Sequence, residues 1–125
     1  MNLKRIASLY AGFVGLSIIG LWIILMSTNQ IPELQTEFYR VITHIFAEII
    51  TAVLLLVSSI GLALDRKWGI RLYTFSLGAL LYTLIASPGY YIQLGIISMG
   101  MLFAVLMVVN LAFLYLIIFS PEKFD

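Results

Sequence analysis

The chain has 125 residues, of which 62% are hydrophobic and 10% are charged, and its formal net charge at pH 7 is +1. Soluble domains are about 45–50% apolar and about 25% charged, so this composition excludes a soluble domain and predicts an integral protein of a lipid bilayer. The near-neutral charge offers no basic face to nucleic acid. Because the sequence has no cysteine, disulfides and thiolate metal sites are also excluded.

Three polar interruptions, at residues 27–37, 65–67 and 87–93, divide the chain into four apolar stretches. At 1.5 Å per residue each stretch is roughly 25–40 Å long, enough to cross a hydrocarbon core of about 30 Å. In lipid the backbone can bond only within its own helix, so we expect helices at about 6–26, 38–64, 70–86 and 95–119. The sequence therefore predicts an all-α, four-transmembrane-helix bundle with up-down topology, forming one membrane domain over residues 1–125.

The distribution of lysine and arginine predicts the direction of the spans. In a four-span topology only Arg40 falls on one side, and the other six cations fall together on the opposite side: Lys4, Arg5, Arg66, Lys67, Arg71 and Lys123. Positive residues favour the cytoplasmic side of a membrane. We therefore expect a multi-pass protein of the cell membrane with both termini in the cytoplasm.

Small residues indicate where the helices pack against one another, because membrane helices associate through close backbone approach and a few hydrogen bonds. In the first span Ser8, Ala11 and Gly15 fall on one helical face. In the fourth span Asn110 is predicted to donate an interhelical hydrogen bond.

The second span carries a polar stripe on an otherwise apolar helix. At 100° per residue, six polar residues lie within about 40° of one meridian, and we expect this face to turn inward. They are Glu37, Arg40, His44, Glu48, Thr51 and Ser58. An ionised side chain at lipid depth costs about 2.5–3.5 kcal/mol on insertion scales, so such residues are paired, hydrogen-bonded, protonated or hydrated.

His44 and Glu48 lie one turn apart on this stripe, so an imidazole–carboxylate contact is expected. The pair has two interpretations. It has a structural role and holds the second helix in the bundle, or it forms a ligand- or proton-binding site reached from the extracytoplasmic side. Thr51 and Arg40 share the stripe, and Trp22 and Tyr82 lie at a similar depth, so these four complete the candidate binding residues. Tyr90 and Tyr91, in the outer loop, are candidates for a lid. No metal site is expected, because two ligands do not make one, and the sequence names no cofactor.

The stretch from residue 47 to residue 84 (AEIITAVLLLVSSIGLALDRKWGIRLYTFSLGALLYTL) resembles the DoxX-like group of small four-helix membrane proteins. The features shared are an acid early in the second helix (Glu48), an apolar run ending in Gly61-Leu62, and a short basic turn before the third helix. Members of that group include subunits associated with quinone-linked oxidoreductases. The resemblance implies a four-span fold, and it implies that Glu48 corresponds to the acid of that group's second helix.

Three functions fit these observations. The first is an accessory or ligand-binding membrane subunit, acting in a homodimer or in a larger membrane complex, whose His/Glu site opens to the extracytoplasmic side. The second is a dimeric proton-coupled small transporter. The third is a membrane enzyme acting on a lipid-soluble substrate. Catalysis is the less favoured prediction, because the sequence shows no nucleophile–histidine–acid set.

Overall fold

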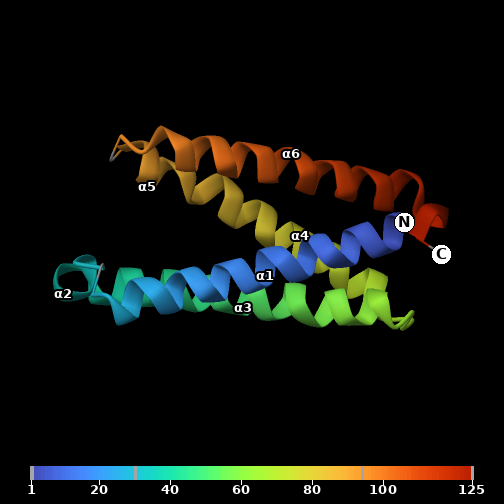
Figure 1. Cartoon of the computed structure of the whole chain (residues 1–125), viewed down its shortest axis with the longest axis horizontal. Coiled ribbons are helices and arrows are strands. Elements are labelled where there is room, and N and C mark those ends of the chain that lie inside the picture. The colour runs from blue at the N-terminus through green and yellow to red at the C-terminus, as the bar shows by residue number, and fades with distance from the viewer. Residues whose placement is uncertain (1, 30, 94, 125) are drawn as a thin grey trace.

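The computed structural model describes residues 2–29, 31–93 and 95–124, and the side chains of Glu33, Tyr90 and Tyr91 are not described. Within those ranges the regular structure is entirely helical (Figure 1). The long helices α1 (Leu3–Ser27), α3 (Phe38–Ala63), α4 (Gly69–Ala86) and α6 (Ile97–Phe119) are each apolar and long enough to cross a membrane. The predicted all-α, four-span fold is confirmed, with boundaries that agree to within a few residues.

Three short helices lie outside these spans: α2 (Glu33–Thr36), α5 (Pro88–Gln93) and the 3-10 helix η1 (Pro121–Phe124). The polar stretch 87–93, which the sequence placed between spans, is therefore mostly helical. Pro88 explains the break after α4, because proline has no N–H to continue a helix but fits the first position of a new one. The chain then turns at Gly95, whose φ of 80° suits glycine.

Most of the packing between the long helices is between spans that follow one another along the chain. α1 and α3 lie side by side, α4 crosses obliquely from α3 towards α6, and α6 packs on α4 and α5 (Figure 1). The start of α1 and helix η1 lie at the same end of the bundle, as an up-down topology requires. We call this the termini end. At the opposite end, α5 and α6 diverge from α1 and α3 (Figure 1).

Small residues bring α1 and α3 together. Ser8 and Ser59 each donate a hydrogen bond to the other's backbone carbonyl, over 2.8 and 2.6 Å. Two turns along, Gly15 lies so close to α3 that a Cβ there would be 3.0 Å from the Ala52 carbonyl oxygen. Ser8, Ala11 and Gly15 are buried, so the predicted packing face of the first span is confirmed.

Three side-chain hydrogen bonds connect the remaining helices. Tyr73 of α4 donates to the Ala7 carbonyl of α1 over 3.0 Å, and Tyr10 of α1 donates to Leu106 of α6 over 3.3 Å. Asn110 of α6 donates to the Leu77 carbonyl of α4 over 3.0 Å, which confirms the predicted interhelical bond. These three bonds connect α1 with α4, α1 with α6, and α4 with α6.

The corner between α3 and α4 depends on two glycines. Asp65, at a φ of 54°, ends α3 in a Schellman motif, in which the Arg66 N–H bonds the Gly61 carbonyl over 2.9 Å. The chain then folds back so closely that a Cβ on Gly69 would lie 2.7 Å from the Gly61 carbonyl carbon. Backbone atoms cannot yield as a flexible side chain can, so any larger residue at Gly69 must move the start of α4.

We predict that Gly69→Ala lowers the free energy of unfolding by about 1–3 kcal/mol, the usual cost of overpacking. Gly78→Ala, on the same helix, is the matched control, because nothing lies within 4 Å of a Cβ at that position. Unfolding in mixed micelles titrated with dodecyl sulfate measures both. Equal stability of the two variants would contradict the described packing of the corner.

Candidate functional site

Glu48 is an acid within the membrane-spanning part of α3. It lies about 15 Å along the helix axis from Phe38 and somewhat farther from Ala63, which places it near the middle of the span. Its side chain is 13% exposed. A carboxylate at this depth requires hydrogen-bond donors or a proton, because lipid supplies neither.

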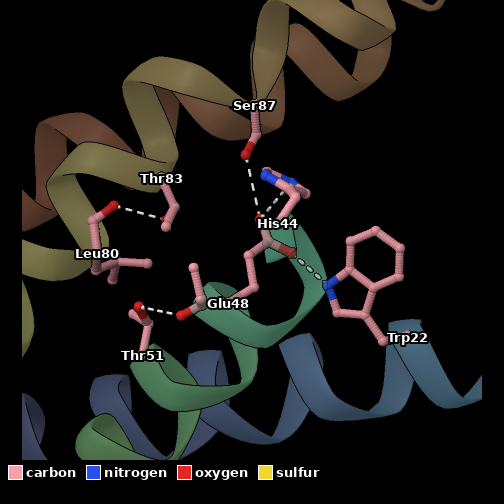
Figure 2. Close-up of polar contacts among 8 residues, drawn as sticks. Trp22, His44, Glu48, Thr51, Leu80, Thr83 and Ser87 are labelled. Atoms are coloured by element: carbon pink, nitrogen blue, oxygen red, sulfur yellow. Dashed lines mark hydrogen bonds and ion pairs between the residues drawn. The ribbon is translucent and has the colours of Figure 1, made fainter. Parts of the chain in front are cut away.

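Polar side chains from three places surround the carboxylate, and two of them donate hydrogen bonds to it (Figure 2). The Trp22 indole N–H of α1 donates to Oε2. The Ser87 hydroxyl, at the break between α4 and α5, donates to Oε1 over 3.2 Å. Nε2 of His44, one turn earlier on α3, lies 3.4 Å from the same Oε1. The side chains of three separate segments therefore converge on one acid.

The local structure of each segment explains the convergence. The close α1–α3 contact at Gly15 carries Trp22, about two turns farther along α1, over the α3 face that holds Glu48. On the other side, the oblique course of α4 brings its last residues to Glu48 where Pro88 interrupts the helix. The Ser87 hydroxyl can then bond a different helix. In contrast, Thr83, one turn earlier, donates to its own helix at Leu80.

His44 stands at the edge of this cluster. Its side chain is 46% exposed, whereas that of Glu48 is largely covered. The Trp22 and His44 rings meet edge-on, with centroids 6.0 Å apart and planes at 77°. The imidazole therefore has one nitrogen facing the acid and a ring surface that is open to the surroundings.

The prediction that the whole polar stripe turns inward is wrong for its first half. Arg40 pairs with Glu37 over 3.0 Å, and their side chains are 81% and 47% exposed. This part of α3 lies at the end where α5 and α6 diverge from α1 and α3, so no neighbouring span covers it. Arg40 is consequently separate from the Glu48 cluster. From Glu48 onward the stripe does turn inward, since Thr51 and Ser58 are buried.

Two other candidates do not contact the acid. Thr51 is buried beside it but donates to the Ala47 carbonyl of its own helix over 2.9 Å. Tyr82 is 74% exposed on α4 and faces away from the bundle. The side chains of Tyr90 and Tyr91, the candidate lid, lie outside the described part of the structure. The structure thus brings together His44, Glu48 and Trp22 of the six candidates.

Ser87 is the contact that sequence reasoning missed. A Ser-Pro-Gly sequence is typical of a turn between spans, and residues there are expected to face water. The signal that could have identified Ser87 is the reading of Pro88 as the first residue of a continuing helix, because this keeps the preceding serine close to the bundle.

The cluster offers hydrogen-bond chemistry rather than a metal centre. In the described part of the chain, no three His, Asp or Glu side chains come together as metal ligands. The groups that meet are one carboxylate, one imidazole, one indole N–H and one hydroxyl. Such a set can accept a proton, or a cationic or hydrogen-bond-donating ligand, at the carboxylate.

Comparison with known protein families gives a match over nearly the whole chain. The sequence model of the family described as "Domain of unknown function (DUF8058)" matches residues 1–124. The chain belongs to this family. The DUF8058 description names no activity, and the comparisons with curated proteins and with solved structures found no match. They add no support to the DoxX-like resemblance, which stays a prediction.

We predict that Trp22→Phe, which keeps an aromatic ring but removes the N–H donor, destabilises the protein by about 1–2 kcal/mol. The same substitution should cost much less in a Glu48→Leu background, because no carboxylate is then left without its donor. A double-mutant cycle of unfolding free energies measures this coupling. Trp68→Phe is the control: Trp68 packs at Gly61, and its effect should be additive with that of Glu48→Leu. An additive Trp22–Glu48 cycle would contradict the contact.

Proposed function

We propose that this multi-pass membrane protein is a ligand-binding or accessory subunit whose site is the Glu48 carboxylate, with His44 at its mouth. One observation carries the proposal. The two carboxylate oxygens are held differently, because Oε2 accepts the indole hydrogen bond of Trp22, while Oε1 has contacts of 3.2 and 3.4 Å, the second of them to a half-exposed imidazole.

These contacts identify Oε1 as the atom that can exchange partners. Nitrogen–oxygen hydrogen bonds are commonest near 2.9–3.0 Å, so the His44 nitrogen, at 3.4 Å, is farther from Oε1 than a usual hydrogen-bond donor. The imidazole is also half-exposed, so a ligand can approach it. If Glu48 had only a structural role, buried donors would be expected to hold both of its carboxylate oxygens at short distances. The arrangement supports exchange at Oε1 and anchoring at Oε2.

The ligand must supply a hydrogen-bond donor or a positive charge to replace Ser87 or His44 at Oε1. The smallest such ligand is a proton. Imidazole is suited to deliver it, since it can accept a proton on one ring nitrogen and donate from the other. His44 lies between Glu48 and the exposed surface, so we assign it the role of relaying the proton.

The side from which the ligand enters follows from charge. Six of the seven lysines and arginines belong to the termini end or to the α3–α4 turn, and positive residues favour the cytoplasm. With both termini cytoplasmic in the cell membrane, α2 and α5 lie on the extracytoplasmic side. His44 precedes Glu48 towards that side, so the site opens outward.

The proposed role is a binding role within a homodimer or a larger membrane complex. Much of α6 is apolar and exposed, including Ile97, Met101, Val105 and Val108, and suits contact with lipid or with another membrane chain. The Ser87 hydroxyl donates to Glu48 and has no described hydrogen bond to His44, so the described contacts do not form a hydroxyl–imidazole–acid set, and we assign the site no reaction.

We predict that Trp22 reports on the occupancy of the site. The chain has two tryptophans, and the Trp68→Phe substitution removes the second, so tryptophan fluorescence then comes from Trp22 alone. In sealed proteoliposomes, an acid step on the extracytoplasmic side should shift this emission at once, because protonation of Glu48 changes the charge beside the indole. The same step on the cytoplasmic side should act only after the proton gradient collapses.

Two substitutions separate this site from general effects of acid. Glu48→Gln should abolish the fast emission change, and His44→Gln should slow it while leaving its final size intact. Glu37→Gln is the matched control, because Glu37 is an exposed acid near the start of the same helix. A response that survives in Glu48→Gln, or that is lost in Glu37→Gln, would refute the proposed site.

A further inference from the structure

A second feature lies at the termini end of the bundle, away from Glu48. A hollow of about 250 Å³ opens there between the start of α1, the α3–α4 turn and η1. Its polar lining consists of Lys4, Asp65, Arg66 and Lys67, and its apolar lining consists of Leu62, Ile70 and Phe124. We call it the basic hollow. Spans begin and end at this level, so the hollow lies where hydrocarbon gives way to lipid headgroups.

The polar half of the basic hollow has more positive than negative charge. Lys4 donates to Asp65, which joins α1 to the α3–α4 turn. That bond occupies the hollow's only acid among the described residues that line it. In the described part of the chain, Arg66 and Lys67 have no ion-pair partner. Two cations in one small hollow repel each other unless an anion lies between them.

The apolar half defines the kind of anion. Leu62 and Phe124 are almost fully buried, at 2% and 4% exposure, so they form the floor of the hollow and offer it little surface. Ile70 is half-buried beside them and supplies the accessible apolar surface. A free inorganic anion would fill the basic side and leave the exposed part of Ile70 without an apolar partner. A molecule that carries a phosphate on an acyl chain would satisfy both halves, with its chain continuing along the lipid-facing helices.

We propose that the basic hollow binds the phosphate of an anionic phospholipid in the leaflet at the termini end. Arg66 and Lys67 donate to the phosphate oxygens, as charge-assisted hydrogen bonds require. The glycerol and upper acyl carbons lie against Leu62, Ile70 and Phe124. Asp65 competes with the phosphate for Lys4, because both are anions within reach of the same ammonium group.

Native mass spectrometry of the full chain in neutral detergent tests this site, with phosphatidylglycerol and phosphatidylcholine as probes. The wild-type protein should bind phosphatidylglycerol more tightly. Because a basic residue near the surface contributes about 1 kcal/mol, the combined substitution Arg66→Gln with Lys67→Gln should reduce this preference about fivefold for each cation removed. The combination Arg66→Lys with Lys67→Arg should retain it.

Two further variants separate an effect of this site from an effect of net charge. Asp65→Asn should strengthen phosphatidylglycerol binding, because it frees Lys4 while asparagine still tolerates the left-handed backbone at this position. Arg40→Gln removes one cation at the other end of the bundle and should change nothing.

Three outcomes would overturn the proposal. Equal affinity for the two lipids would exclude a phosphate-selective site. A loss of preference in Arg40→Gln that equals, for each cation removed, the loss in the Arg66/Lys67 variant would assign the effect to net charge. Displacement of bound phosphatidylglycerol by inorganic phosphate at comparable concentration would identify a free-anion site instead of a lipid site.

Discussion

The structure depends on one constraint: an acid placed in the apolar part of a membrane must be surrounded by donors. Glu48 meets it with hydrogen bonds from the indole of Trp22 and the hydroxyl of Ser87, and the imidazole of His44 lies beside it. Both donors come from segments other than the helix that carries the acid. The carboxylate therefore links the α1–α3 pair to the end of α4, at a place where the described helices otherwise diverge.

The packing of the rest of the bundle makes this convergence possible. The reciprocal Ser8–Ser59 bonds and the close approach at Gly15 fix α1 on α3, which sets where Trp22 lies. The tight corner at Gly61 and Gly69 sets the direction in which α4 leaves α3. Both devices rely on residues with little or no side chain. The positions of Trp22 and Ser87 around the acid thus follow from small residues at other helix contacts.

The sequence predicts the spans well, because each is a long apolar run with polar ends, and lipid allows the backbone few alternatives to a helix. Helical spacing predicts the contact between His44 and Glu48, and depth makes Trp22 a candidate, but depth alone does not decide the contact, since Tyr82 is a candidate on the same ground. The sequence does not predict Ser87, whose role depends on a helix resuming after Pro88. Nor does it predict that Arg40 stays outside or that Tyr82 faces away, because these depend on how far neighbouring helices diverge and on their rotation.

The contact between Trp22 and Glu48 is the central claim, and the indole resonances of the ¹⁵N-labelled protein test it most directly. The chain has two tryptophans, so two indole N–H signals are expected, and Trp68→Phe assigns them. Glu48→Gln should move the Trp22 signal strongly, because its acceptor loses its charge, and should leave the Trp68 signal in place. A Trp22 signal identical in the two proteins would show that the acid is held in some other way, and the account of the site would then be wrong.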